Sequence, residues 1–259
     1  MAAGTFYPGR ADELAAMVDS MLAGAKAVGG SHGSDQAPPV ALVAPHAGYA
    51  FSGPVAASAY ALLRGSDIHR AAILGPAHFV PLRGCAVPAT DVWRTPLGQV
   101  GIDRELRNTL EGPGVAVDEA PHEPEHSIEV QLPFLQRVLG AGLTVLPVAV
   151  GASEPGEIAT MIEALADDAV IIVSTDLSHY HDHATARQLD RRTADAVLAR
   201  EPGSIGPEDA CGVFALRGLV ELARRRRLQT ELLDLRTSAE TAGDPLRVVG
   251  YGAFALRGG

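Results

Sequence analysis

Short, continuously apolar segments recur along the chain and alternate with longer stretches of helical periodicity. The apolar segments are rich in valine, isoleucine and alanine, and the clearest lie at residues 40–46, 70–78, 143–151, 169–179 and 246–256. A strand that is apolar at every position is covered on both of its faces. The pattern therefore predicts a largely parallel sheet between layers of helices.

Apolar residues at helical spacing separate these predicted strands. They predict helices at residues 11–23, 53–64, 126–140, 154–167, 184–200 and 211–223. The alternation predicts a single α/β domain over residues 1–259, with a mostly parallel or mixed central sheet and helices on both faces. Gly, Ser and Pro without periodicity predict one exposed, flexible loop at residues 26–39.

Three of the predicted strands lead directly to a histidine, at His46, His78 and His179. Ligands of open α/β sheets bind beyond the carboxyl ends of the strands, so parallel strands would bring the three histidines to one rim. Imidazole is a common transition-metal ligand and titrates near neutral pH. Each histidine alone is equally typical of a helix cap or a loop hydrogen bond, but together the three predict a functional site.

A two-histidine metal site needs a third donor, and four side chains offer one: Asp176, Glu125, Glu129 and Cys211. Spacing does not choose among them, because these residues come from different loops. His126 and Glu129 are three apart, so a helix here would present them on one face. The alternative is that this acidic segment only caps the start of the helix.

Aromatic residues make up only 5% of the chain, yet several fall in predicted loops. We predict that five of them wall an apolar pocket beside the histidines: Phe6, Tyr7, Tyr49, Phe51 and Trp93. We expect the last four to contact substrate. Anchoring of the loops would explain them nearly as well.

The formal net charge of −10 disfavours general attraction to nucleic acid or to an anionic membrane. Arg224 to Arg227 form the one basic run, and we interpret it as the solvated end of a helix. The chain shows no signal-peptide pattern and no apolar run of about 20 residues, which favours a cytoplasmic protein. Common nucleotide-binding and serine-hydrolase motifs are missing from the sequence.

Seven short motifs stand in one order across almost the whole chain: GTFYPG, APHAGYAFSG, ILGPAHFVPL, WRTPLG, EHSIEVQLPFL, LPVAVG and STDLSHY. Together they resemble the Memo family, whose bacterial members are called AmmeMemoRadiSam system protein B. The family is similar in fold to class III extradiol ring-cleaving dioxygenases, which hold non-haem Fe(II) with two histidines and a carboxylate.

The resemblance implies three metal ligands, namely His46, His78 and Cys211. It also implies that four catalytic side chains line the same cleft: His179, Asp176, His126 and Glu129. We assign acid/base roles to His179 and His126. A cysteine in place of the carboxylate departs from the dioxygenase pattern and lets copper or zinc compete with iron. The family's bacterial name further implies association with a radical-SAM protein and an AMMECR-type protein.

The sequence thus leads to a first hypothesis of a metal-dependent redox enzyme or oxygenase with iron or copper at a two-His, one-Cys site. Two alternatives stay open. One is a binding or adaptor protein that keeps the cleft for a small molecule or peptide without the chemistry, and the other is a zinc-dependent hydrolase.

Overall fold

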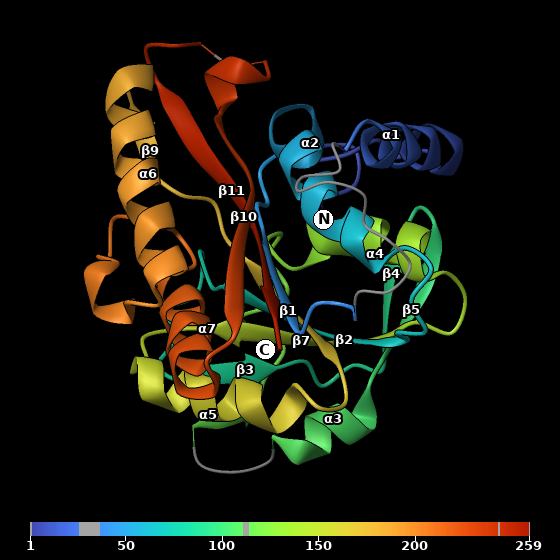
Figure 1. The fold of residues 1–259 in the computed structure, drawn as a ribbon. Helices are drawn as coiled ribbons and strands as arrows, with labels where there is room; N and C mark the ends of the chain where they lie inside the picture. The colour runs from blue at the N-terminus through green and yellow to red at the C-terminus, as the bar shows by residue number, and fades with distance from the viewer. Residues whose placement is uncertain (1, 26–36, 111–113, 243, 259) are drawn as a thin grey trace.

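Four parallel strands form the middle of the sheet. The computed structural model describes residues 2–25, 37–110, 114–242 and 244–258, and Figure 1 shows its fold. The parallel strands lie side by side in the order β1 (Ala41–Ala44), β8 (Val170–Ser174), β2 (Arg70–Pro76) and β7 (Thr144–Val150). Their carboxyl ends consequently meet at one edge of the sheet, as the apolar segments predict.

Antiparallel pairs extend this parallel centre and make the eleven-stranded sheet mixed. On one side, β11 (Val248–Arg257) runs antiparallel to β1, and β10 (Gln229–Thr237) runs antiparallel to β11. On the other side, β3 (Cys85–Val87) runs antiparallel to β7. The shorter strands complete the sheet: β4 (Val92–Thr95), β5 (Gly98–Ile102), β6 (Val115–Val117) and β9 (His179–His181).

Helices cover both faces of the sheet, which confirms the predicted architecture. One hydrophobic cluster holds side chains of α1 (Ala11–Gly24), α2 (Tyr49–Tyr60) and α4 (Leu132–Leu139). The other holds side chains of α3 (Arg104–Thr109), α5 (Pro155–Leu165), α6 (His183–Ala199) and α7 (Val213–Arg226). Four 3-10 turns complete the set: η1 (Ala61–Leu63), η2 (Glu129–Gln131), η3 (Pro202–Ser204) and η4 (Ser238–Glu240).

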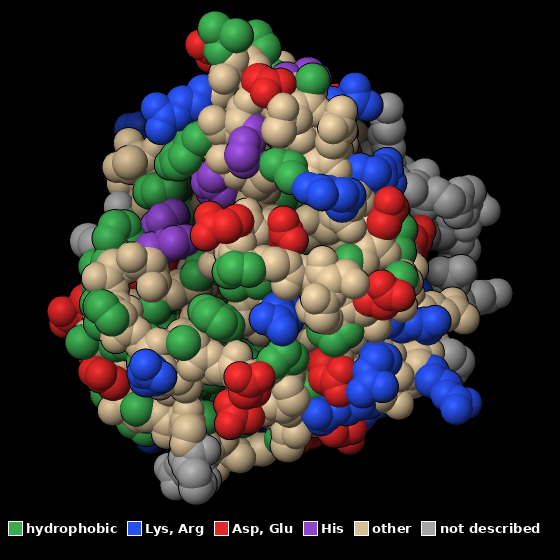
Figure 2. All heavy atoms as spheres, turned by 90° about the vertical axis from the view of Figure 1, so that its left-hand side faces the viewer, with side chains coloured by type: hydrophobic (Ala, Val, Ile, Leu, Met, Phe, Trp, Pro, Cys, Tyr) green, Lys and Arg blue, Asp and Glu red, His purple; other side chains and the backbone are tan. Residues whose placement is uncertain are grey.

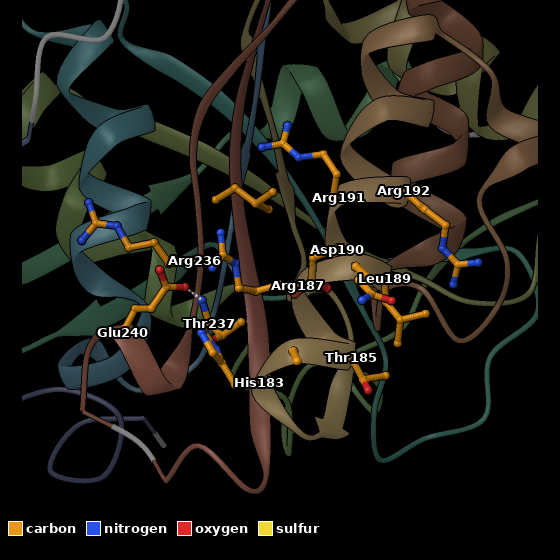
Figure 3. A pocket seen from close by; sticks show the side chains of 13 residues that line it. His183, Thr185, Arg187, Leu189, Asp190, Arg191, Arg192, Arg236, Thr237 and Glu240 are labelled. Carbon is orange, nitrogen blue, oxygen red and sulfur yellow. Dashed lines mark hydrogen bonds between the residues drawn. The ribbon is translucent and has the colours of Figure 1, made fainter.

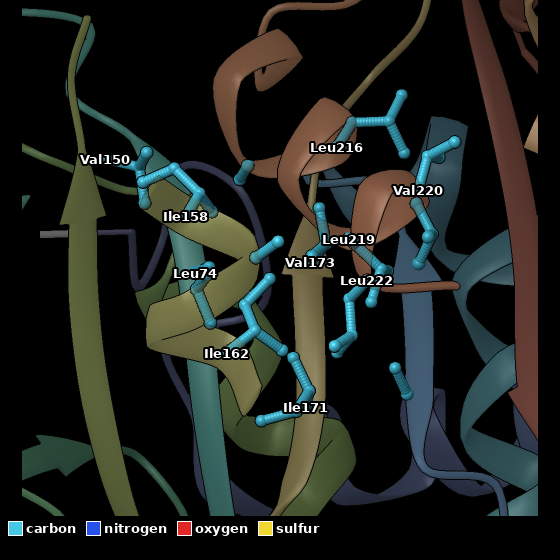
Figure 4. Close-up of a cluster of buried hydrophobic side chains, with 14 of the residues drawn as sticks. Leu74, Val150, Ile158, Ile162, Ile171, Val173, Leu216, Leu219, Val220 and Leu222 are labelled. Carbon is cyan, nitrogen blue, oxygen red and sulfur yellow. The ribbon is translucent and has the colours of Figure 1, made fainter. Parts of the chain in front are cut away.

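Successive residues of the central strands are buried in opposite layers. Ala41 and Val43 of β1 belong to the cluster with α5 and α7, whereas Leu42 and Ala44 belong to the cluster with α1 and α2. Figure 4 shows how side chains of α5 and α7 fill the first of these layers against β2 and β8. Burial on both faces explains why these strands are apolar at every position.

The predicted helix at residues 126–140 starts later than its periodicity indicates. Glu125 Oε1 accepts the backbone N–H groups of His126 and Ser127, at 2.9 and 2.8 Å, and this holds the segment in a turn. The 3-10 turn η2 follows, and regular α-helix begins only at Leu132. The Glu125 side chain thus holds residues 126 and 127 in a turn, and the His126 ring does not lie on the surface of a helix.

The other predicted elements agree with the structure within a few residues. The arginine run 224–227 ends α7, with Arg224 and Arg225 paired to Glu221. Most of the predicted loop at 26–39 lies outside the described residues, and residues 37–39 have no regular secondary structure. No helix in the described ranges has the length and apolarity needed to span a membrane.

Candidate metal centre

Three histidines from three distant segments meet at the carboxyl edge of the sheet. His46 follows β1, His78 follows β2, and His126 lies in the turn before η2. One ring nitrogen from each can be chosen so that all three atoms lie within 4.8 Å of one another. The ring centroids are 5.3 to 5.6 Å apart. This spacing suits a single metal ion bound by three imidazoles.

A buried serine fixes the tautomer of His46. Ser174 Oγ donates its one hydrogen to the Ser127 carbonyl at 2.6 Å and accepts a hydrogen from Gln131 Nε2 at 2.7 Å. Its contact with His46 Nδ1, at 3.0 Å, must therefore be a second accepted hydrogen bond. Nδ1 carries the proton, which leaves the lone pair of Nε2 for a metal.

Glu125 orients the other two rings. Its Oε1 lies 3.0 Å from His78 Nδ1 and 3.4 Å from His126 Nδ1, and its Oε2 accepts the His78 backbone N–H at 2.7 Å. Burial alone would raise the pKa of Glu125, but the hydrogen bonds from His78 and from the Ser127 N–H lower this pKa to about 2. The ionised carboxylate therefore accepts the Nδ1 hydrogen of His78, and its negative charge 3.4 Å from His126 Nδ1 favours a proton there, so both rings keep Nε2 for a metal.

Two of the rings are held neutral by their surroundings. Burial lowers the pKa of His46 to about 4, with the Asp176 charge opposing this shift. Burial also lowers the pKa of His126. A neutral imidazole is the form that binds metal, so both rings are ready to coordinate at neutral pH.

Cys211 lies at the edge of the three-histidine group. Its Sγ is 3.3 Å from His46 Nε2 and accepts the Asp176 backbone N–H at 3.2 Å. Burial raises the pKa of the Cys211 thiol to about 12, with the Asp176 charge adding to this shift. The thiol is therefore protonated unless a cation lies beside it.

An open pocket of about 630 Å³ adjoins the histidines. Its lining includes His46, His78 and His126, the predicted catalytic residues Asp176 and His179, and Cys211. In Figure 2 several histidine side chains lie close together on one face of the molecule, beside acidic side chains. The structure thus gathers the predicted rim residues around one solvent-accessible space.

Comparison with known proteins agrees with this architecture. Residues 1–255 match the sequence profile of the family described as "Memo-like protein". The chain belongs to the Memo family. A MEMO1 family protein of Methanopyrus kandleri is 38% identical over 99% of this chain and 98% of its own. One of Methanococcoides burtonii is also 38% identical, over 84% of this chain and 86% of its own.

A solved structure shares the fold of this Memo family member at low sequence similarity. It is a crystal structure of an uncharacterized protein from Escherichia coli K12. The match has a TM-score of 0.51 and 15% identity, and it covers 82% of this chain and 98% of that one. At this identity the match supports the α/β fold alone.

The four aromatics that are predicted to contact substrate are not among the residues that line the 630 Å³ pocket. Tyr7 is buried and donates to Glu129 Oε1 at 2.6 Å, while Tyr49 is buried and donates to the Val130 carbonyl at 2.6 Å. Phe51 is 39% exposed on α2, and Trp93 packs 5.8 Å from the His122 ring. In this Memo-family fold the tyrosines anchor the loops, and contact of any of the four with substrate remains a prediction.

Other aromatic residues lie beside the histidines. Phe6 stacks on the His126 ring, with centroids 4.2 Å apart and planes inclined by 22°. Phe79 lies 6.1 Å from the same ring, and Tyr180 lines the pocket. Phe6 was predicted among the aromatics of the pocket wall, and it does line the pocket. Phe79 and Tyr180 were not predicted; each follows a histidine of a motif, and that adjacency is the signal that could have identified them.

The sequence gives His126 and Glu129 a shared catalytic role, but the structure separates their surroundings. His126 joins the metal-binding group, whereas Glu129 accepts from Tyr7 and from the Ala2 backbone N–H at 3.1 Å. The orienting partners Ser174 and Gln131 have no distinguishing sequence signal, because they reach His46 only through the folded sheet.

Proposed function

We propose that the protein binds a transition-metal ion through His46, His78 and His126 and uses it for oxidoreductase chemistry on a small molecule. The observation that carries this proposal is the approach of three ring nitrogens to within 4.8 Å of one another beside an open pocket. Their fit to a metal rests on the donor set. Ser174 and Glu125 hydrogen-bond the Nδ1 atoms of His46 and His78, the Glu125 carboxylate lies 3.4 Å from His126 Nδ1, and the Nε2 lone pairs stay available.

Iron and copper are the proposed ions, with zinc as a competitor. Imidazole suits all three metals, and a nearby thiol shifts the preference toward the softer ones. Cys211 could join the coordination, since its Sγ already lies 3.3 Å from His46 Nε2. Bound iron or copper would supply one-electron and dioxygen chemistry to the site.

The side chains around the pocket would position substrate and move its protons. His179 Nδ1 donates to the Leu177 carbonyl at 2.8 Å, so the neutral ring keeps an unprotonated Nε2 that can accept a proton from substrate. Asp176 Oδ1 accepts the His46 backbone N–H at 2.8 Å and so fixes the loop that carries this ligand. We assign His179 the role of general base and Asp176 a positioning role.

The pocket lining and the family resemblance also bear on the substrate and the cellular setting. Phe6 and Tyr180 beside polar groups favour a small molecule or a peptide side chain with a flat apolar portion. A cytoplasmic location, together with a radical-SAM protein and an AMMECR-type protein as functional partners, remains part of the proposal through the family resemblance.

Zinc-dependent hydrolysis is the second candidate, and the three-histidine donor set favours it. Three imidazoles with a fourth position open is an arrangement of catalytic zinc, which activates a bound water without redox chemistry. An adaptor role is the third candidate. Phe79 and Tyr180 favour it, because they are 60% and 64% exposed and can contact a partner.

Metal analysis of protein purified without a histidine tag tests the proposal. The wild type is expected to retain close to one iron or copper ion per chain, and the double variant His46→Ala, His78→Ala is expected to retain almost none. The exposed His69 precedes β2, at the opposite end of that strand, so His69→Ala is the matched control and should keep its metal. Equal, negligible metal in all three proteins would overturn the proposal.

Two single variants decide the donor set and the class of reaction. If three histidines suffice, Cys211→Ser retains metal and His126→Ala loses it, whereas a two-His, one-Cys site gives the reverse result. Zinc in the wild type, with chelation abolishing ester or amide hydrolysis, would favour the hydrolase. If a binding partner binds His46→Ala as tightly as it binds the wild type, the result would favour the adaptor role.

A further inference from the structure

A second cavity lies between α6 and the β10 segment, away from the metal centre. Its volume is about 880 Å³, and none of its lining residues lines the pocket at the histidines. The walls come from residues 183–192 of α6 and from residues 235–240 at the end of β10. This cavity is larger than the metal-site pocket and takes no part in the chemistry proposed above.

Arginines dominate the charge of this cavity. It is lined by Arg187, Arg191, Arg192 and Arg236, in a chain whose net charge is −10. Figure 3 shows Arg187 and Arg191 extending from α6 toward the strands, whereas Arg192 points away on the opposite side of the helix. Arg187 and Arg191 are four apart and therefore share one face of α6.

Protein carboxylates leave most of this positive charge uncompensated. Arg236 is paired to Asp234, with nitrogen–oxygen distances of 2.9 and 2.6 Å. Among the described residues, the one ion-pair contact of Arg191 is a distant one, 3.9 Å, with the exposed Asp195. Within the described ranges Arg187 makes no side-chain hydrogen bond and no ion pair. Two guanidinium groups on one face of α6 are therefore available to an external anion.

The acidic side chains of the cavity are engaged elsewhere. Glu240 accepts the Thr237 backbone N–H at 2.9 Å and so caps the turn η4. Asp190 is 1% exposed, and its Oδ1 accepts the Ser178 backbone N–H at 2.9 Å. Asp190 Oδ2 is also buried and has no hydrogen-bond partner among the described residues, so it makes no bond to either arginine. Neither carboxylate competes directly for the two arginines.

The backbone N–H groups at the start of α6 are not the groups that we propose to bind an anion. Asp182 Oδ1 already accepts the N–H groups of Ala184 and Thr185, both at 3.1 Å. An anion in this cavity would therefore depend on guanidinium groups. Guanidinium binds carboxylate and phosphate oxygens with paired, charge-assisted hydrogen bonds.

The geometry points to a second ligand site in this cavity, at which Arg187 and Arg191 bind the oxyanion of a small phosphorylated or carboxylated molecule. The cavity has room for a body beyond the anionic group, and Leu235 provides an apolar contact on its wall. The site is independent of the proposed metal chemistry, so either proposal can fail without the other.

Titration of the full-length protein with two probes, inorganic phosphate and succinate, tests this site. We expect saturable binding of at least one probe, measured by calorimetry and by NMR shifts of α6 amides. The double variant Arg187→Ala, Arg191→Ala should weaken that binding at least about tenfold. Tighter binding of phosphate would identify a phosphoryl ligand, and tighter binding of succinate a carboxylate ligand.

Arg64→Ala is the control, because Arg64 is exposed and is not among the residues that line the cavity, so this variant removes the same charge from outside the site. Its affinity should stay within about twofold of the wild type, apart from a small loss of long-range attraction. The three arginines are exposed, and far-UV circular dichroism and metal content should not change in either variant. Absence of binding to the wild type, or equal losses in both variants, would overturn the proposal.

Discussion

At the scale of single residues, Glu125 acts on two of the three histidine rings of the site. One buried carboxylate contacts the Nδ1 atoms of both His78 and His126. We predict that Glu125→Gln lowers metal affinity about 10- to 100-fold, because the neutral amide accepts the His78 Nδ1 hydrogen more weakly and removes the negative charge beside His126 Nδ1. Competition with a chelator of known affinity measures the change.

The control for this variant is Glu123→Gln, two residues away and exposed. Its metal affinity should equal that of the wild type. Unchanged affinity in Glu125→Gln would mean that the three rings keep their orientation without this carboxylate, and that packing such as the Phe6 stack is sufficient.

The Asp103 carboxylate contributes to the stability of the fold rather than to the site. Burial alone would raise its pKa, but hydrogen bonds from Arg70, Leu106 N–H and Thr144 lower this pKa to about 2. A depressed carboxyl pKa stabilises the fold above the unfolded-state pKa, and this stabilisation is lost as the pH falls toward 2. Asp103→Asn should therefore cost about 1–2 kcal/mol at pH 7.

Urea denaturation of Asp103→Asn and wild type between pH 7 and pH 3 checks this prediction. The difference in unfolding free energy should shrink steadily below about pH 4. The exposed Asp67 provides the control, since Asp67→Asn should match the wild type throughout. A difference for Asp103→Asn that is independent of pH would show that shape, not charge, matters at this position.

At the scale of elements, the packing of α5 on α7 depends on a glycine. A Cβ atom at Gly218 would overlap the side chain of Ile158. We predict that Gly218→Ala destabilises the protein by about 1–3 kcal/mol, although alanine favours helix, because the two helices must move apart. Thermal and urea denaturation measure the loss.

Gly24 in α1 gives the matched comparison, because no atom of the described residues beyond its own chain neighbours and helix backbone lies within 4 Å of a Cβ built there. Gly24→Ala should leave stability unchanged or raise it by up to about 1 kcal/mol through helix propensity. Equal effects of the two substitutions would contradict close α5–α7 packing as the cause.

The sequence predicts the central strands well, because a strand that is buried on both faces has apolar residues at every position. β1, β2, β7 and β8 are apolar throughout and were all predicted. β10 was not predicted, because most of its residues are only partly buried and its sequence mixes charged and apolar positions. The site residues also differ in how far the sequence alone indicates them. Strand ends indicate His46 and His78, whereas the place of His126 depends on tertiary contacts of Glu125.

At the scale of the whole molecule, a bound metal would connect three segments that are distant in sequence. A ligand that binds only the native state adds RT ln(1 + [L]/Kd), about 2.7 kcal/mol at 100 times Kd. For a protein of this size that corresponds to a rise in Tm of roughly 5–10 °C. We predict this rise for the wild type on adding the cognate metal, and none for His46→Ala, His78→Ala.

Differential scanning calorimetry with and without chelator tests the prediction. His69→Ala should show the wild-type shift. An equal shift in the double variant would place the stabilising metal elsewhere on the protein.

The hydrogen bonds of Ser174 and Glu125 also bear on how the protein exchanges its ion. Each ring is oriented by protein contacts on its Nδ1 side, so these rings need little rearrangement to accept an ion. Sites of the zinc-finger type fold only with their metal and cannot release it without unfolding. This site is preorganised, so the chain should lose one ion and take up another while staying native, and the ion it carries would then follow the metals its surroundings supply.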